Sequence, residues 1–169
     1  MMLDIAPTLA MYDKTDQEFA TKYWHWFFLI QPSPFPENLI LNNQEEFKAR
    51  FFGGVYAGQK GFMSEQALDE YVAQFKDAAC VHAICEDYRA AATIDLVEAR
   101  SDREAGRKIK CPVRVLWGKK GVIEKSFDCL GEWGAVSDND VSGEAVDSGH
   151  YIAEEVPDVV LKHAREFFG

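Results

Sequence analysis

The stretch Val113-Arg114-Val115-Leu116-Trp117-Gly118 decides the fold class, because a short run of β-branched and large apolar residues closed by glycine is typical of a buried strand. A weaker run of the same kind covers residues 141–146. Helical patterns follow both runs, at about 125–133 and at 157–168. Pro157 stands in the first turn of the second helix, where proline is tolerated best. The order of strand, helix, strand and helix predicts parallel strands with right-handed crossovers, and therefore an α/β fold.

The residues ahead of this segment, from about 13 to 108, have the patterns of helices. Thr15 and Glu18 have the spacing of a capping box, which predicts a helix running to about Ile30, just before a cluster of prolines. Further helices are expected at 44–52, closed by Gly53 and Gly54, from Ser64 to about 75, and at about 79–97. A helical unit should therefore precede the small sheet.

Length and composition indicate one globular domain of 169 residues, 47% of them hydrophobic. The net charge of −10 argues against a nucleic-acid partner, because affinity for nucleic acids depends on lysine and arginine neutralising phosphates. The longest dense apolar run, 24–30, is too short to span a bilayer, and the amino terminus lacks the pattern of an export signal. Four cysteines without Cys-x-x-Cys spacing argue against zinc and favour a reduced, cytoplasmic setting: Cys80, Cys85, Cys111 and Cys129.

His150 follows the second predicted strand on a Ser148-Gly149 turn, where an α/β enzyme places its general base. No predicted strand leads into the small-x-nucleophile-x-small turn that would present a nucleophile to this base. The nearest candidate, Gly54-Val55-Tyr56-Ala57-Gly58, has tyrosine at its centre and follows a helix. The sequence therefore predicts a base without a nucleophile, and the alternative is an ordinary surface-loop histidine. Glu154 and Glu155 are expected to favour the start of the last helix through its dipole.

Several short motifs are distributed along nearly the whole chain. They are Leu3-Asp4-Ile5-Ala6-Pro7-Thr8, Trp24-His25-Trp26, Gln31-Pro32-Ser33-Pro34, Pro36-Glu37-Asn38-Leu39, Cys85-Glu86-Asp87-Tyr88-Arg89-Ala90, Leu116-Trp117-Gly118 and Ser148-Gly149-His150. Together they resemble the motifs of the α/β hydrolases and, within them, of the haloacetate (fluoroacetate) dehalogenases. The last two motifs are general to the superfamily, and those in the middle of the chain are much more specific.

The resemblance implies a truncated α/β-hydrolase fold, with a helical cap and a small remnant of the parallel sheet made of strands six to eight. Residues 1–12 would be the remnant of strand six and the acid loop, 13–108 the helical cap, and 109–169 the carboxyl-terminal core segment. The half of the fold that carries the nucleophile would be absent from this chain.

The same resemblance implies the roles of individual residues. In these dehalogenases an aspartate attacks the carbon that bears the halogen, and a histidine then activates the water that hydrolyses the ester. His150 matches the base and Asp4 its orienting acid, although an aspartate in a frayed terminal turn is the alternative. His25, Trp26 and Tyr88 match the donors that bind the halide, and the competing explanation is an aromatic helix core. No metal or other cofactor is implied.

The expected ligand is a haloacetate-like small molecule, bound only when the missing half is supplied, so the isolated chain is expected to be inactive. Strand six would be an open edge, which predicts self-association or pairing with a separate amino-terminal segment. An epoxide hydrolase is the nearest alternative, but its cap normally carries a tyrosine pair, and Trp24-His25-Trp26 favours a dehalogenase. The third possibility is a non-catalytic remnant that binds or assembles.

Overall fold

The computed structural model describes residues 1–52 and 61–169 of the chain. Strand β1 (Met2–Leu3) comes first and precedes the helices α1 (Thr8–Asp13), α2 (Gln17–Lys22), α3 (Trp24–Leu29), α4 (Phe35–Asn42), α5 (Gln44–Phe52), α6 (Glu65–Gln74), α7 (Ala78–Ala92) and α8 (Ile94–Ala105). The remaining elements are β2 (Val113–Gly118), α9 (Val122–Ser126), α10 (Cys129–Ala135), β3 (Val141–Val146), α11 (Ile152–Glu155) and α12 (Pro157–Phe168). None of the described helices is long and apolar enough to cross a membrane.

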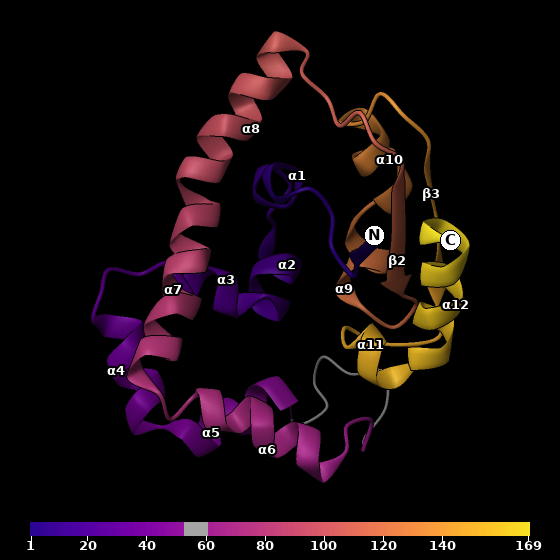
Figure 1. Cartoon of the computed structure of the whole chain (residues 1–169). Helices are drawn as coiled ribbons and strands as arrows, with labels where there is room; N and C mark the ends of the chain where they lie inside the picture. The colour runs from indigo at the N-terminus through magenta and orange to yellow at the C-terminus, as the bar shows by residue number, and fades with distance from the viewer. Residues whose placement is uncertain (53–60) are drawn as a thin grey trace.

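The strands β1, β2 and β3 form a parallel sheet in that order within the described residues, as the alternation of strand and helix predicts (Figure 1). Strand β2 pairs with β3 over its whole length, from Val113 opposite Val141 to Gly118 opposite Val146. Because the strands point the same way, their carboxyl ends meet at one edge of the sheet. The loops that follow the three strands therefore start close to one another.

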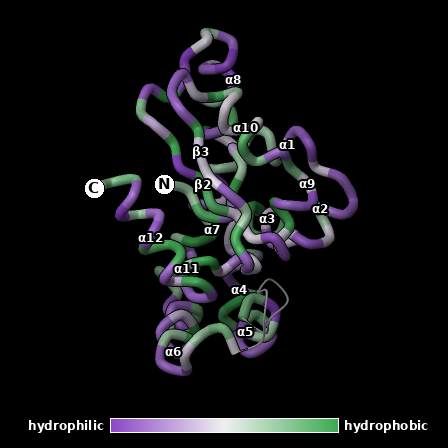
Figure 2. The backbone as a smooth tube through the Cα atoms, turned by 90° about the vertical axis from the view of Figure 1, so that its right-hand side faces the viewer, coloured by the Kyte–Doolittle hydropathy of each residue, from purple (hydrophilic) through white to green (hydrophobic). Residues whose placement is uncertain are grey.

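Apolar side chains cover the sheet on both faces, because successive residues of a strand point to opposite sides. The larger core packs Val115 of β2 against α2, α3, α9 and α10, and its aromatic members are Phe19, Tyr23, Trp26, Phe127 and Trp133. A smaller cluster packs Leu116, Val146 and Ile152 against α12, which lies on the other side of the sheet in Figure 1. The helical part has a cluster of its own, formed by Leu29, Ile40, Phe47, Phe75, Val81 and Cys85. Hydrophilic residues gather at the outer end of α8 and around α6 (Figure 2).

Three helices that the sequence pattern presents as continuous are broken in the structure. The segment 15–30 forms α2 and α3 on either side of Tyr23. The N-cap of α2 is Asp16 rather than Thr15, and its carboxylate accepts a hydrogen bond from the N–H of Phe19 at 2.8 Å. The helix expected at 79–97 breaks at Thr93, and the helix expected at 125–133 is α9 followed by α10.

Other boundaries confirm the sequence pattern. Helices α5 and α12 and strand β3 have the expected ranges, and Ser64 caps α6 by accepting a hydrogen bond from the N–H of Ala67 at 3.2 Å. Helix α4 was not expected; it begins directly after the prolines and carries Pro36 in its first turn, where the missing N–H is not needed. The glycine pair Gly53 and Gly54, and the candidate turn at 54–58, lie outside the described residues.

Candidate active site

Asp4 follows β1 directly, and the backbone on both sides of it is held by neighbouring elements. Its N–H donates to the carbonyl of Leu116 at 2.7 Å, and the indole N–H of Trp133 donates to the carbonyl of Ile5 at 2.9 Å. Asp4 has a φ of +48°, a left-handed conformation that costs a residue with a Cβ about 1 kcal/mol. Its side chain is fully buried, and Oδ1 accepts a hydrogen bond from the N–H of Gly118 at 2.9 Å. These contacts fix the direction of the carboxylate.

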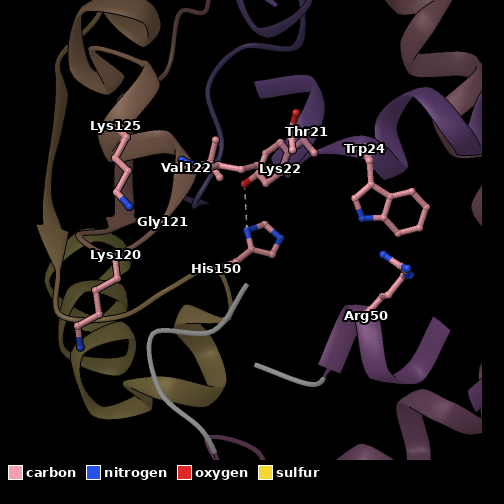
Figure 3. A pocket seen from close by; sticks show the side chains of 10 residues that line it. Thr21, Lys22, Trp24, Arg50, Lys120, Gly121, Val122, Lys125 and His150 are labelled. Carbon is pink, nitrogen blue, oxygen red and sulfur yellow. Dashed lines mark hydrogen bonds between the residues drawn. The ribbon is translucent and has the colours of Figure 1, made fainter. Parts of the chain in front are cut away.

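The second carboxylate oxygen of Asp4 meets the ring of His150. Asp4 Oδ2 lies 2.7 Å from His150 Nδ1. The Tyr23 hydroxyl oxygen lies 3.4 Å from the same nitrogen, and Figure 3 draws this contact as the dashed line to His150. Since a carboxylate only accepts, Nδ1 carries a proton and Nε2 is the ring nitrogen that can take up another. The structure therefore brings Asp4 and His150 together in the geometry of a general base and its orienting acid.

A cavity of about 400 Å³ opens beside this pair, and 37% of the His150 side chain is exposed. Among the described residues, those that line it are Thr21, Lys22, Tyr23, Trp24, Arg50, Lys120, Gly121, Val122, Lys125 and His150. Four of them are lysine or arginine, and none is aspartate or glutamate. Three of these four cations pair with carboxylates that do not line the cavity: Lys22 with Glu18, Arg50 with Glu46 at 2.8 Å and Lys120 with Asp147 at 2.9 Å. The cavity is therefore much less positive than a count of its basic residues indicates.

His25, Trp26 and Tyr88, from α3 and α7, form one aromatic cluster. The ring centroid of Tyr88 lies 5.8 Å from that of His25 and 6.1 Å from that of Trp26. Tyr23 connects this cluster to the Asp4–His150 pair, because its ring centroid lies 5.3 Å from that of His25 and 5.9 Å from that of His150. Among the described residues that line the cavity, Tyr23 is present but the three predicted halide donors are not.

The buried position of His25 controls its charge. Burial, and after it the nearby charge of His150, lowers the pKa of His25 to about 3. His25 is therefore neutral at physiological pH and keeps one ring N–H as a donor.

Two residues of the site were missed because they carry no chemical signature in the sequence. Tyr23 has the pattern of a core aromatic, and it is 2% exposed, yet its hydroxyl reaches His150. Gly118 was expected only to close a strand, and it also donates its N–H to Asp4. A Cβ at Gly118 would lie 2.1 Å from the carbonyl oxygen of Gly149, so only glycine fits between the strand end and the His150 loop.

One cluster among the described residues has the composition of a metal site, in the helical part of the chain. The ligand atoms of Glu37, His82 and Glu86 lie within 4.8 Å of one another. The guanidinium of Arg89 donates to Glu37 at 2.8 Å and to Glu86 at 2.6 Å, and so already supplies the positive charge there. The geometry is that of a buried ion pair rather than of a cation site.

Comparison with known proteins supports the fold and the resemblance. No protein-family model matches the chain. A curated fluoroacetate dehalogenase from a Burkholderia species is 36% identical over 167 residues, which make up 98% of this chain and 54% of that protein. The chain therefore spans about half the length of this relative.

Solved structures lead to the same fold class. A protein from Nostoc sp PCC 7120 that is named as an α/β hydrolase matches with a TM-score of 0.91 at 46% identity, over 98% of this chain and 56% of that one. A Pseudomonas aeruginosa protein named as an epoxide hydrolase matches with a TM-score of 0.85 at 36% identity, over 98% of this chain and 54% of that one. The prediction of an α/β-hydrolase architecture, with a helical part and a small portion of the parallel sheet, is confirmed.

Proposed function

We propose that this chain, which resembles the carboxyl-terminal part of the fluoroacetate dehalogenase-like α/β hydrolases, supplies the water-activating base, its acid and the halide-binding residues of a hydrolytic dehalogenase. One observation carries the proposal. The Asp4 carboxylate lies 2.7 Å from His150 at the carboxyl edge of the parallel sheet, beside a cavity that has room for a small substrate.

In the proposed reaction the nucleophile is an aspartate supplied by a segment outside this chain. Its carboxylate forms a C–O bond to the carbon that bears the halogen, the carbon–halogen bond breaks, and halide leaves. His150 then takes a proton from water through Nε2 while that water attacks the carbonyl of the ester. The carboxylate of Asp4 holds the ring in the required tautomer and stabilises the imidazolium that forms.

His25, Trp26 and Tyr88 are the proposed donors to the departing halide. A ring N–H of His25, the indole N–H of Trp26 and the phenolic O–H of Tyr88 are all donors, and they come from side chains that pack against one another. A fluoride ion gains most from such donors in a site that excludes water. Because His25 is neutral, it would release the halide more readily than a cation.

The motif Trp24-His25-Trp26, more than the charge of the cavity, favours a haloacetate over an epoxide as the substrate. A haloacetate carries a carboxylate, whereas an epoxide is neutral, and the described lining of the cavity has four basic residues and no carboxylate. Three of the four pair with Glu18, Glu46 and Asp147, so the charge adds little to this preference. The epoxide hydrolase remains the second candidate because the Pseudomonas aeruginosa protein of that name has the same fold over 98% of this chain, and either reaction would use His150 as the base.

An amino-terminal segment outside residues 1–169 is proposed to complete the fold, and self-association of the chain is the proposed alternative. In the proposed division, residues 1–12 contribute a strand and the acid, 13–108 the cap, and 109–169 the core segment with the base. The isolated chain would then be catalytically silent, and a cytoplasmic setting fits its four free cysteines.

The proposal is tested by supplying the missing half. The chain is assayed alone, and after mixing with a separately produced amino-terminal segment of the Burkholderia relative, with co-elution of the two confirmed by gel filtration. We expect no fluoride release from fluoroacetate by the chain alone, and release by the complex. His150→Ala should abolish it, and Asp4→Asn should lower it by about 10⁴-fold, as expected when the orienting acid of such a base is lost.

The same complex is offered an epoxide in parallel. Diol formation without fluoride release would replace the dehalogenase by an epoxide hydrolase. A complex that forms and catalyses neither reaction would favour the non-catalytic alternative, and fluoride release by the chain alone that survives His150→Ala would refute the proposed base.

A further inference from the structure

We infer that Glu155 is a positioning residue for His150, because its carboxylate holds the backbone on both sides of the histidine. The N–H of Gly149 donates to Glu155 Oε2 at 3.0 Å and to Oε1 at 3.1 Å. The N–H of Tyr151 donates to Oε1 at 3.2 Å. This inference rests on the proposed function only in taking His150 as the base.

The carboxylate of Glu155 is itself held in place by the fold. Glu155 is the last residue of α11, and the first residue of that helix, Ile152, is 1% exposed and packs on Leu116 and Val146 of the sheet. A short helix anchored on the core thus turns its last side chain back toward the loop that precedes it. The sequence suggested only a favourable interaction with the dipole of the last helix, and the structure directs this carboxylate to the His150 loop instead.

Hydrogen bonds from amides to a charged acceptor are stronger than those between neutral groups. Two backbone N–H groups donate to this carboxylate, and that of Gly149 is shared between its two oxygens. Gly149 is a buried residue, so removing the carboxylate would leave its N–H without this acceptor in a place with little access to water. His150 lies between Gly149 and Tyr151 in the chain, the two residues whose N–H groups donate to Glu155. A shift of this short segment would move the ring away from Asp4, whose own position is fixed by Gly118 and Leu116.

The neighbouring Glu154 provides a matched control. It precedes Glu155 in α11, carries the same side chain and is also half-buried, but its carboxylate accepts a hydrogen bond from the hydroxyl of Tyr71 on α6. Replacing Glu154 therefore removes a carboxylate from the same helix without touching the backbone of the His150 loop.

The test reads the Asp4–His150 hydrogen bond directly, in the 169-residue chain and without turnover. Proton NMR of the ¹⁵N-labelled chain should show a downfield Nδ1–H resonance of His150, assigned by its loss in His150→Gln. In Glu155→Ala we expect exchange of this proton with water to be at least about tenfold faster, since the lost hydrogen bonds to a charged acceptor are each worth more than a tenfold change in an equilibrium. Glu154→Ala should leave the exchange rate within about twofold of the parent chain.

Glu155→Gln guards against a variant that fails to fold, because it keeps the size of the side chain and one oxygen that can accept, and it should show an intermediate rate. An unchanged exchange rate in a folded Glu155 variant, or an equal increase in Glu154→Ala, would overturn the inference. The dehalogenase proposal stands apart, because the fluoride assay can fail while the resonance still depends on Glu155.

Discussion

At the scale of single residues, Gly118 holds the two residues of the candidate pair, Asp4 and His150, in position relative to each other. Its N–H donates to the carboxylate of Asp4, and its Cα faces the carbonyl of Gly149, the residue before His150. One backbone position thus contacts Asp4 on one side and the loop of His150 on the other. The absence of a side chain is the property that allows both contacts.

Gly118→Ala should therefore damage both stability and the site. The added Cβ would lie 2.1 Å from the carbonyl oxygen of Gly149, a backbone atom that must move, and such overpacking costs about 1–3 kcal/mol. Urea denaturation measures the loss. Gly134→Ala in α10 is the control, because a Cβ there meets nothing within 4 Å and alanine favours a helix. Equal stability of the two variants would contradict the close contact.

At the scale of elements, Arg89 of α7 ties together the parts of the helical unit that carry the aromatic cluster. Its guanidinium donates to Glu37 of α4 at 2.8 Å and to the carbonyl of Gln31, just after α3, at 2.7 Å. Arg89 also follows Tyr88 in the chain. The helix that carries His25 and the helix that carries Tyr88 are thus joined through a single side chain.

The buried pair Glu37–Arg89 predicts a specific dependence of stability on pH. The hydrogen bond from Arg89 lowers the pKa of Glu37 from 4.5 to about 2. A carboxyl whose pKa falls on folding stabilises the folded state above its unfolded pKa, and this contribution disappears as the pH drops through the folded value. The contribution, up to about 3 kcal/mol, should be complete above about pH 4.5 and lost by about pH 2.

Glu37→Gln is the variant that exposes this dependence. Its deficit in unfolding free energy, measured in urea, should be largest at pH 7 and smaller at pH 3. The exposed pair Glu46–Arg50 on α5 serves as the control, and Glu46→Gln should change stability by less than about 1 kcal/mol at either pH. A deficit of Glu37→Gln that is the same at both pH values would show that Glu37 is not held ionised by Arg89.

Part of the fold and of the site was predictable from local sequence alone. The strands β2 and β3 stand out because apolar, β-branched runs end at a glycine or at a turn, and α12 because proline marks its first turn. The breaks at Tyr23 and Thr93 are not predictable in this way, since the helical pattern continues across them and tertiary packing imposes the interruption.

The candidate site depends on contacts that no local pattern contains. Asp4 and His150 were assigned through resemblance to a family, and they meet across 146 positions of the chain. The hydroxyl of Tyr23 reaches His150 across 127 positions, so a buried aromatic residue could not be distinguished in advance from any other core residue. Glu155 is only five residues from His150, but the direction of its carboxylate depends on how α11 packs on the sheet.

At the scale of the whole molecule, β1 is an edge of the described sheet and has only two residues. The expected self-association, or pairing with an amino-terminal segment, would use this edge. Light scattering of the purified chain over a range of concentrations should therefore give a mass above that of one chain, or a one-to-one complex once the segment is added. A mass of one chain at every concentration, unchanged after the segment is added, would contradict this expectation.

The exposed apolar residues of α12 offer a competing explanation for any association. Phe168 is 69% exposed and Leu161 is 51% exposed, and both lie on the last helix. The double variant Phe168→Ser and Leu161→Ser should leave association intact if β1 is the edge that pairs. If the double variant is a monomer, the contact between chains lies on α12 instead.

The basic lining of the cavity affects how salt should act on the molecule. Screening at physiological ionic strength limits interactions between exposed charges to about 8 Å. A small anion beside His150 would therefore interact with the basic lining residues and the carboxylates paired with them, rather than with the overall charge of −10. Lysine and arginine do not distinguish a carboxylate from chloride by charge. Chloride would therefore compete for the same place, and a buffer based on a bulky, weakly binding anion would leave the cavity open to its ligand.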